Sequence, residues 1–210
     1  MPAWADQSVS KLLSREQVLE RVKNGKNLQE CLLVRVDLAG AVLAGVNLTQ
    51  AKLVGANCEK SDLRGSTLTS ANLVTANLVG SNLEDADLSL ADLTNARLSG
   101  ANLTGANLHR AVLGHADLSE ADLTGVNLSG ADLSGANLAG ANLTGAEMWA
   151  VILRGANLAH ANLTGVDLTG ADLTRADLSG ANLTGADVDG AKLKRVRLSG
   201  ANLTAVKNWR

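Results

Sequence analysis

The sequence predicts an all-β solenoid, in which short extended segments coil into a rod and each coil stacks on the last. A five-residue phrase repeats without an insertion from residue 26 to residue 205. Leu occupies the third position of nearly every repeat, and the chain contains no Phe, no Tyr and only three Trp. A core without aromatic rings of several shapes has no irregular gaps to fill, so the interior must be regular.

The period of five requires the chain to turn within every repeat. On an α-helix, residues five apart are rotated by about 500°, so the leucines would spiral around all sides. On a continuous strand they would alternate between the two faces. We therefore expect the first and third residues of each repeat to point inward. Asn or Asp at the second position and Gly at the fifth supply the turns.

The repeats ANLTG, ADLSG and ANLAG resemble the A(D/N)LXX consensus of the pentapeptide-repeat family. The resemblance covers residues 26–205 and implies a right-handed quadrilateral parallel β-helix with four repeats in each coil. The 36 repeats would then form nine coils, with residues twenty apart stacked on each other. Layers about 4.8 Å apart would make a rod about 43 Å long.

Residues 1–25 are predicted to form an N-terminal segment with a short capping helix. Ser14 and Gln17 have the spacing of a capping box, and Leu13 with Val18 suits a hydrophobic staple. Gly25 is a suitable stop.

The opposite end is less protected. Residues 206–210 form a short tail in which only Val206 and Trp209 could cover the last coil. This end is therefore a candidate contact for weak association between two copies of the chain.

Charge is spread unevenly over a chain whose net charge is −2. Residues 81–150 carry nine acidic and two basic groups, whereas residues 191–210 carry six basic groups and no acid. No apolar run approaches the eighteen residues or so of a membrane span, so we expect a soluble protein. It is cytoplasmic by default. A periplasmic or thylakoid-lumen location stays open if Ala3-Trp4-Ala5 is the remnant of a signal-cleavage site.

No active site, cofactor site or metal site is predicted. His109, His115 and His160 fall on three different faces of a four-repeat coil, whereas zinc ligands must converge at about 2 Å. The Asp residues at second positions are typical of a solvated face that supports turns. Cys31 and Cys58 occupy inward positions, where they are expected as buried small hydrophobic residues rather than as a disulfide.

Two functions remain open. The first is a non-enzymatic scaffold that binds another protein through its variable outward positions. The alternative comes from the resemblance, because some family members mimic DNA and bind gyrase or topoisomerase. Those members tend to have Phe at many centres and a C-terminal dimerising helix, and this chain has neither. Its repeats are closer to those of the long cyanobacterial members.

Three groups of outward residues depart from the repeat. The first is an apolar column, which would either dock a partner or pack side by side. The second is a basic group, which would either meet an anion or block aggregation. Binding of nucleic acid is not expected there, because no aromatic side chains are interleaved. The column consists of Val34, Val54 and Val74, and the basic group of Lys192, Lys194, Arg195 and Arg197.

The third group lies in the stretch AEMWAVILRG, residues 146–155. Trp149, Ile152 and Arg154 are expected to point outward around one corner of a coil. A Trp and an Arg beside an exposed aliphatic residue have the composition of an interface hot spot. Single exposed apolar residues are also common on surfaces that bind nothing. The sequence leaves both interpretations open.

Overall fold

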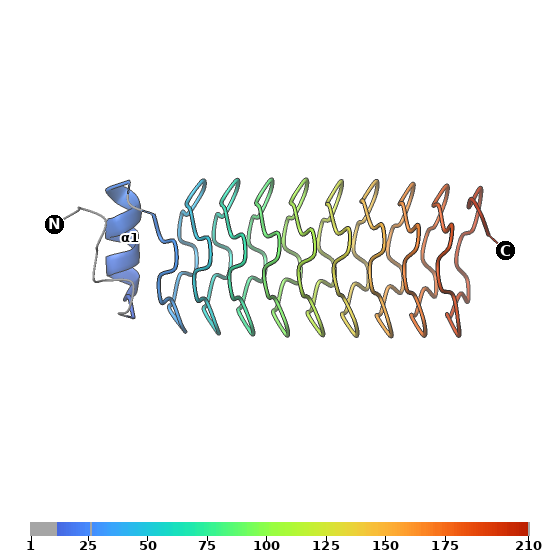
Figure 1. The fold of residues 1–210 in the computed structure, drawn as a ribbon, viewed down its shortest axis with the longest axis horizontal. Helices are drawn as coiled ribbons and strands as arrows, with labels where there is room; N and C mark the ends of the chain where they lie inside the picture. Colours follow the sequence, from blue (N-terminus) through green and yellow to red (C-terminus); the bar gives the residue numbers. More distant parts are fainter. Residues whose placement is uncertain (1–11, 26, 210) are drawn as a thin grey trace.

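The computed structural model describes residues 12–25 and 27–209, which form a rod with helix α1 at one end and stacked coils along the rest (Figure 1). Ala3-Trp4-Ala5 and the last residue of the tail lie outside the described residues. Parallel bridges join residues twenty apart along the rod, from Leu32 with Lys52 to Asp187 with Lys207. One turn of the coil therefore holds four repeats.

The interior consists of the first and third residues of each repeat. The third residues from Leu28 to Leu183 are at most 2 % exposed. Each buried leucine contributes about 1.5–3 kcal/mol of transfer free energy. The backbone is paired between coils: the N–H of Leu133 donates to the carbonyl of Ile152 at 2.7 Å, and that of Gly135 to the carbonyl of Arg154 at 2.9 Å. The two buried cysteines, Cys31 and Cys58, are not joined in a disulfide.

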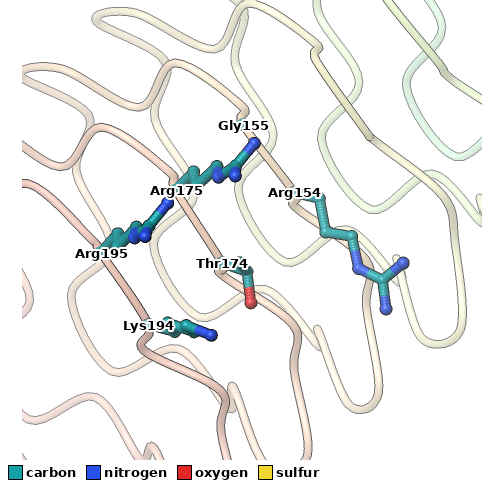
Figure 2. Close-up of a pocket in the computed structure, with 6 residues that line it drawn as sticks. All are labelled: Arg154, Gly155, Thr174, Arg175, Lys194 and Arg195. Atoms are coloured by element: carbon teal, nitrogen blue, oxygen red, sulfur yellow. The ribbon is translucent and has the colours of Figure 1, made fainter.

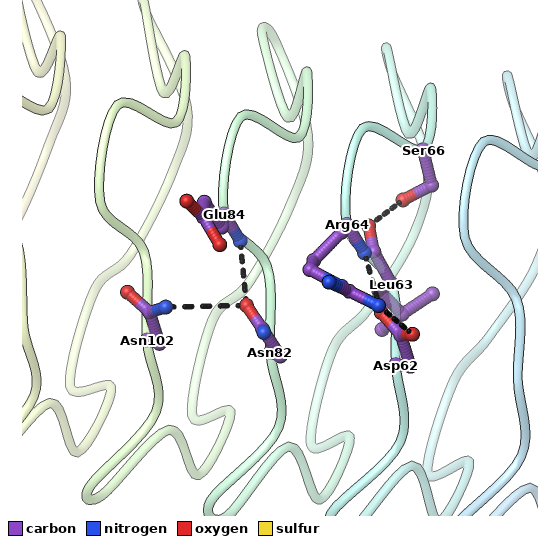
Figure 3. Close-up of polar contacts among 7 residues, drawn as sticks. All are labelled: Asp62, Leu63, Arg64, Ser66, Asn82, Glu84 and Asn102. Atoms are coloured by element: carbon purple, nitrogen blue, oxygen red, sulfur yellow. Dashed lines mark hydrogen bonds and ion pairs between the residues drawn. The ribbon is translucent and has the colours of Figure 1, made fainter.

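Asn and Asp at the second position close the turns. Asn82 Oδ1 accepts hydrogen bonds from the backbone N–H of Glu84 at 3.1 Å and from Nδ2 of Asn102, one coil further, at 3.3 Å (Figure 3). The first bond forms an Asx-turn and the second a ladder between coils. The same side chain thus shapes its own turn and aligns the next one.

The fifth position has a left-handed backbone. Gly145 has a φ of 67°, and residues other than glycine adopt the same conformation, as Ala150 does with a φ of 54°. Glycine is the commonest occupant because it has no Cβ to clash in this region. A larger residue at a fifth position therefore adopts a strained backbone conformation.

Helix α1, Arg15–Lys23, lies at the N-terminal end of the rod. The predicted capping box of Ser14 and Gln17 is confirmed, with both reciprocal hydrogen bonds formed. Val18 is fully buried and Leu13 is 5 % exposed. Arg15 Nη1 donates to the carbonyl of Asp37 at 2.9 Å, which ties the helix to the first coils.

The last coil is less protected than the others. Its inward residues Leu193 and Leu198 and the tail residue Val206 are only partly buried, and Leu203 is 36 % exposed. Trp209 is itself 40 % exposed. Within the described residues, no helix is long and apolar enough to cross a membrane.

Candidate functional site

Trp149, Ile152 and Arg154 lie along one face of the rod. Trp149 is in the turn before the face, Ile152 is the bridged residue on it, and Arg154 is in the turn after it. Trp149 is 56 % exposed, Ile152 is half-buried and Arg154 is exposed. The three side chains thus extend across a face from one turn to the next, rather than around a single corner.

The residues stacked on this group are small or acidic. Trp149 lies between Ser129 and Thr169. The carbonyl of Trp149 accepts a backbone N–H from the turn that contains Ser129, and the carbonyl of Thr169 accepts one from the turn that contains Trp149. Ile152 is bridged to Asp132 and Asp172. Neither the indole nor the aliphatic group of Ile152 has a like neighbour in the stack. The regular packing of the coils therefore does not require either of them.

Arg154 makes an ion pair with the coil that follows. Its Nε and Nη2 atoms each lie 2.8 Å from Oδ2 of Asp172. Nζ of Lys192 lies 3.4 Å from the same oxygen. Asp172 is only 6 % exposed, so its carboxylate links three successive coils from a nearly buried position.

The environment of Asp172 favours its charged form. Burial raises the pKa of this carboxyl, but hydrogen bonding to Thr174 and Arg154, together with the charge of Arg154, outweighs burial and holds the pKa far below its usual range. The second oxygen, Oδ1, accepts the backbone N–H of Thr174 at 3.1 Å, as in other turns. Asp172 is therefore both a turn residue and the anchor of Arg154.

The sequence did not single out Asp172. Once residues twenty apart are known to stack, its contact with Lys192 can be read directly from the repeat. The contact with Arg154 can be found in the same way, because a fourth-position side chain reaches a second-position residue eighteen positions later. The degree of burial is not visible in the sequence, since it depends on how these side chains fold over the carboxylate.

The structure divides the predicted basic group. Lys192 contacts Asp172, and Nη2 of Arg197 lies 2.6 Å from Oδ2 of Asp177. Lys194 and Arg195 instead line an open depression of about 500 Å³. Its remaining lining residues are Arg154, Gly155, Thr174 and Arg175 (Figure 2). Sequence reasoning missed Arg175, although it stands one coil before Arg195.

The apolar column of Val34, Val54 and Val74 is half-buried. These residues lie in stacked turns. The carbonyl of Val54 accepts a backbone N–H from the turn that contains Val34, and the carbonyl of Val74 accepts one from the turn that contains Val54. Half-burial reduces the apolar area that the column can offer to a partner. The column remains a candidate surface, although it is less exposed than Trp149.

The histidines are dispersed along the rod. His109, His115 and His160 lie in three different columns of turn residues. Among the residues described, no three His, Cys, Asp or Glu side chains are grouped so that they could hold a metal ion. Burial, and to a smaller extent the charge of Asp37, raises the pKa of Cys58 to about 12, so this thiol is a poor nucleophile at neutral pH.

Comparison with protein families matches almost the whole repeat region to a single family. The family described as pentapeptide repeats (8 copies) matches residues 31–69, 71–110, 106–145, 131–170, 152–190 and 171–207. Comparison with curated proteins gives no significant match.

Two of the solved structures that match this chain are similar to it over most of its length. One is HetL, a pentapeptide repeat protein involved in heterocyst differentiation regulation from the cyanobacterium Nostoc sp. strain PCC 7120. It is 35% identical, with a TM-score of 0.53, and the match covers 92% of this chain and 98% of HetL. The other is trypsin-treated QnrB1, a plasmid-mediated fluoroquinolone resistance protein, which is 21% identical, with a TM-score of 0.72. That match covers 82% of this chain and 87% of QnrB1, and it bears on the fold alone.

Proposed function

The chain belongs to the pentapeptide-repeat family, and we propose that it is a non-enzymatic scaffold that binds a protein partner through outward residues of a rigid rod. The fold of the family is a right-handed quadrilateral β-helix. We further propose nine coils over residues 26–205, a capping role for the segment 1–25 that includes α1, and a short tail at 206–210. The register of twenty and the packing of α1 against the first coil support this division.

The observation that carries the proposal is the exposure of Trp149. A rod of this kind can vary its outward residues at little cost, because the interior already fixes the fold. An indole that is 56 % exposed between Ser129 and Thr169 has no packing role that a small polar residue could not fill. Partly exposed aromatic residues are frequent anchors at protein interfaces.

Arg154 adds a rigid polar contact beside this anchor. Its guanidinium is held on Asp172 by two contacts of 2.8 Å, so little side-chain freedom is lost when a partner binds. Ile152 lies between the arginine and the indole. An aromatic anchor, an aliphatic residue and a fixed arginine together form the binding surface that we propose.

The test compares the parent chain with the double variant Trp149→Thr, Ile152→Asp in pull-downs from the source organism. Both substitutions restore residues that the repeat uses at these positions, so the fold should be kept. Val112→Asp is the matched control, because Val112 is a 42 % exposed aliphatic residue in the column of Ile152, also between two aspartates. Loss of a partner from the double variant, with retention by the control, supports the proposal. Equal retention by both, or a large drop in melting temperature of the double variant, contradicts it.

The alternative function is binding to gyrase or topoisomerase in place of DNA. The nine acids between residues 81 and 150 favour it, and the basic group at the last coils disfavours it, because a DNA mimic needs negative charge along the whole rod. We expect no inhibition in a DNA supercoiling assay. Inhibition at sub-micromolar protein would reverse this ranking.

We also propose weak association between two copies through the less protected last coil. The exposed Leu203 and the opposite charges of residues 81–150 and 191–210 support it. Light scattering at increasing protein concentration should show a growing mass that falls when salt is added. A constant monomer mass at all concentrations and salt levels would remove this part of the proposal.

A further inference from the structure

Two arginines stacked in successive turns are unusual in this rod. Arg175 and Arg195 occupy the same fifth position in adjacent coils, where the coil before has Gly155. At every other described fifth position that carries a charge, the stacked neighbours are uncharged. Adjacent layers are about 4.8 Å apart, and like charges that face each other at this spacing repel.

The two side chains extend in a shared direction. At another turn, Arg110 lies over the glycine of the next coil, its Cγ being 3.4 Å from the point where a Cβ of Gly130 would stand. Arg175 has no glycine there, because its next neighbour is Arg195. Figure 2 shows Arg175 extending toward Gly155 instead, and Arg195 extending toward Arg175. The two guanidinium groups therefore lie beside the same depression. Gly155 also lines this depression, and it adds no side chain there.

Most of the positive charge at this depression is not neutralised by the protein. Of the cations that line it, Arg154 is paired with the carboxylate of Asp172, which Lys192, outside the depression, also contacts. Within residues 12–25 and 27–209, no carboxylate lies within ion-pair distance of Arg175, Lys194 or Arg195. Three cations without an ion-pair partner thus line an open depression of about 500 Å³.

We propose that this depression binds a phosphoryl group, with Arg175 and Arg195 as forked donors and Lys194 as a third cation. A phosphomonoester carries a charge of about −1.5 to −2 at neutral pH and has three strong acceptor oxygens. The planar guanidinium groups match such oxygens in pairs. A single carboxylate would neutralise only one of the three cations. This inference goes beyond the scaffold function and does not depend on Trp149.

The surroundings favour a compact ligand over a nucleic acid. A nucleic-acid duplex that lay along the rod would extend from the basic depression onto residues 81–150. That stretch carries nine acidic and only two basic groups, so it would repel the phosphates. Single strands bind through aromatic side chains that stack on the bases, and the depression has none. The site fits one phosphoryl group, supplied either by a small phosphate ester or by a phosphorylated side chain of a protein.

The experiment measures binding of inorganic phosphate, phosphoserine and a phosphoserine-containing peptide by calorimetry and by thermal shift. Malonate, a dicarboxylate of similar charge, is the chemical control. The variant Arg175→Gly, Arg195→Gly places glycine at two left-handed positions, so it should fold at least as well as the parent. Arg110→Gly is the matched control, because it removes an isolated arginine from the same kind of turn.

We expect phosphate and phosphoserine to raise the melting temperature of the parent and of Arg110→Gly. The double glycine variant should bind at least tenfold more weakly. A peptide that binds more tightly than free phosphoserine identifies the source as a phosphorylated protein, whereas equal affinities identify a small ester. The proposal is overturned if no phosphate ligand binds, if malonate binds as tightly as phosphate, or if the double variant keeps the parent's affinity.

Discussion

Residues 121–145 and residues 146–175 share one interior and differ in their outward positions. In the first stretch the fourth positions are Ser, Thr or Ala and every fifth position is Gly. The second stretch contains Trp149, Arg154 and Arg175. Yet Leu133 and Leu153, the matching third residues, are both 0 % exposed. The interior sets the fold of both stretches in the same way, so the outward departures are free to serve binding.

The largest effect is expected from the shared interior. Leu133→Ala and Leu153→Ala each remove a fully buried side chain from a closely packed layer, and each should lower the free energy of unfolding by about 2–5 kcal/mol. Urea denaturation monitored by circular dichroism measures both. Values that agree within about 1 kcal/mol would support equal packing in the two stretches. A much smaller loss at Leu153 would mean that the variable stretch is loosely packed.

The interior was also the part that the sequence predicted best. A period of five with leucine at the third position requires the leucines to point inward, whichever protein the rod binds. The spacing of Ser14 and Gln17 likewise predicted the capping box. The candidate site was harder to predict. The sequence placed Arg154 at an outward position of a candidate interface, but it did not indicate that Asp172 holds the guanidinium. The register of twenty brings Arg154 near Asp172, but the near-complete burial of the carboxylate depends on how the side chains fold over it, which the sequence does not show.

A smaller loss of stability than at the leucines is expected from Asp172→Asn. Its matched comparison is Asp132→Asn, two coils earlier in the same column. Asn keeps the Oδ1 acceptor of the turn in both cases, so only the charge is removed. Asp172 holds Arg154 and Lys192, and loss of these charge-assisted contacts should cost about 1–3 kcal/mol. Asp132 accepts hydrogen bonds from Ser134 and has no ion pair among the described residues, so its substitution should change stability by less than about 0.5 kcal/mol.

The same pair gives a pH test. Because the pKa of Asp172 is lower in the folded state than the usual value of about 3.9, its stabilisation is complete above that value and is lost as pH falls toward the folded pKa. The stability difference between the parent and Asp172→Asn should therefore be constant near neutral pH and shrink below about pH 4. A difference that stays constant down to pH 2 would show that the charge of Asp172 is not the cause.

A still smaller effect, of opposite sign in the two stretches, is expected at the fifth positions. Gly145→Ala forces a Cβ into a backbone with a φ of 67°, and nothing lies within 4 Å of that Cβ, so the cost is backbone strain alone, about 1 kcal/mol. Ala150→Gly relieves the same strain at a φ of 54°, partly offset by the greater entropy of glycine in the unfolded chain. Melting temperatures should fall for the first variant and rise slightly for the second. A fall in both would mean that the turn at Ala150 tolerates its Cβ without strain.

The smallest effect is expected at a first position, where an earlier part of the rod uses serine in place of alanine. Ser66 is fully buried, and its hydroxyl donates to the carbonyl of Leu63 at 2.7 Å (Figure 3). That carbonyl also accepts the backbone N–H of Ser66 at 3.1 Å, so Ser66→Ala leaves no buried polar group without a partner. Loss of one neutral hydrogen bond is then balanced by removal of a buried hydroxyl, and stability should change by less than about 0.5 kcal/mol. A loss of 2 kcal/mol or more in urea denaturation would show that the hydroxyl is needed to hold the turn, and that the first position is not interchangeable along the rod.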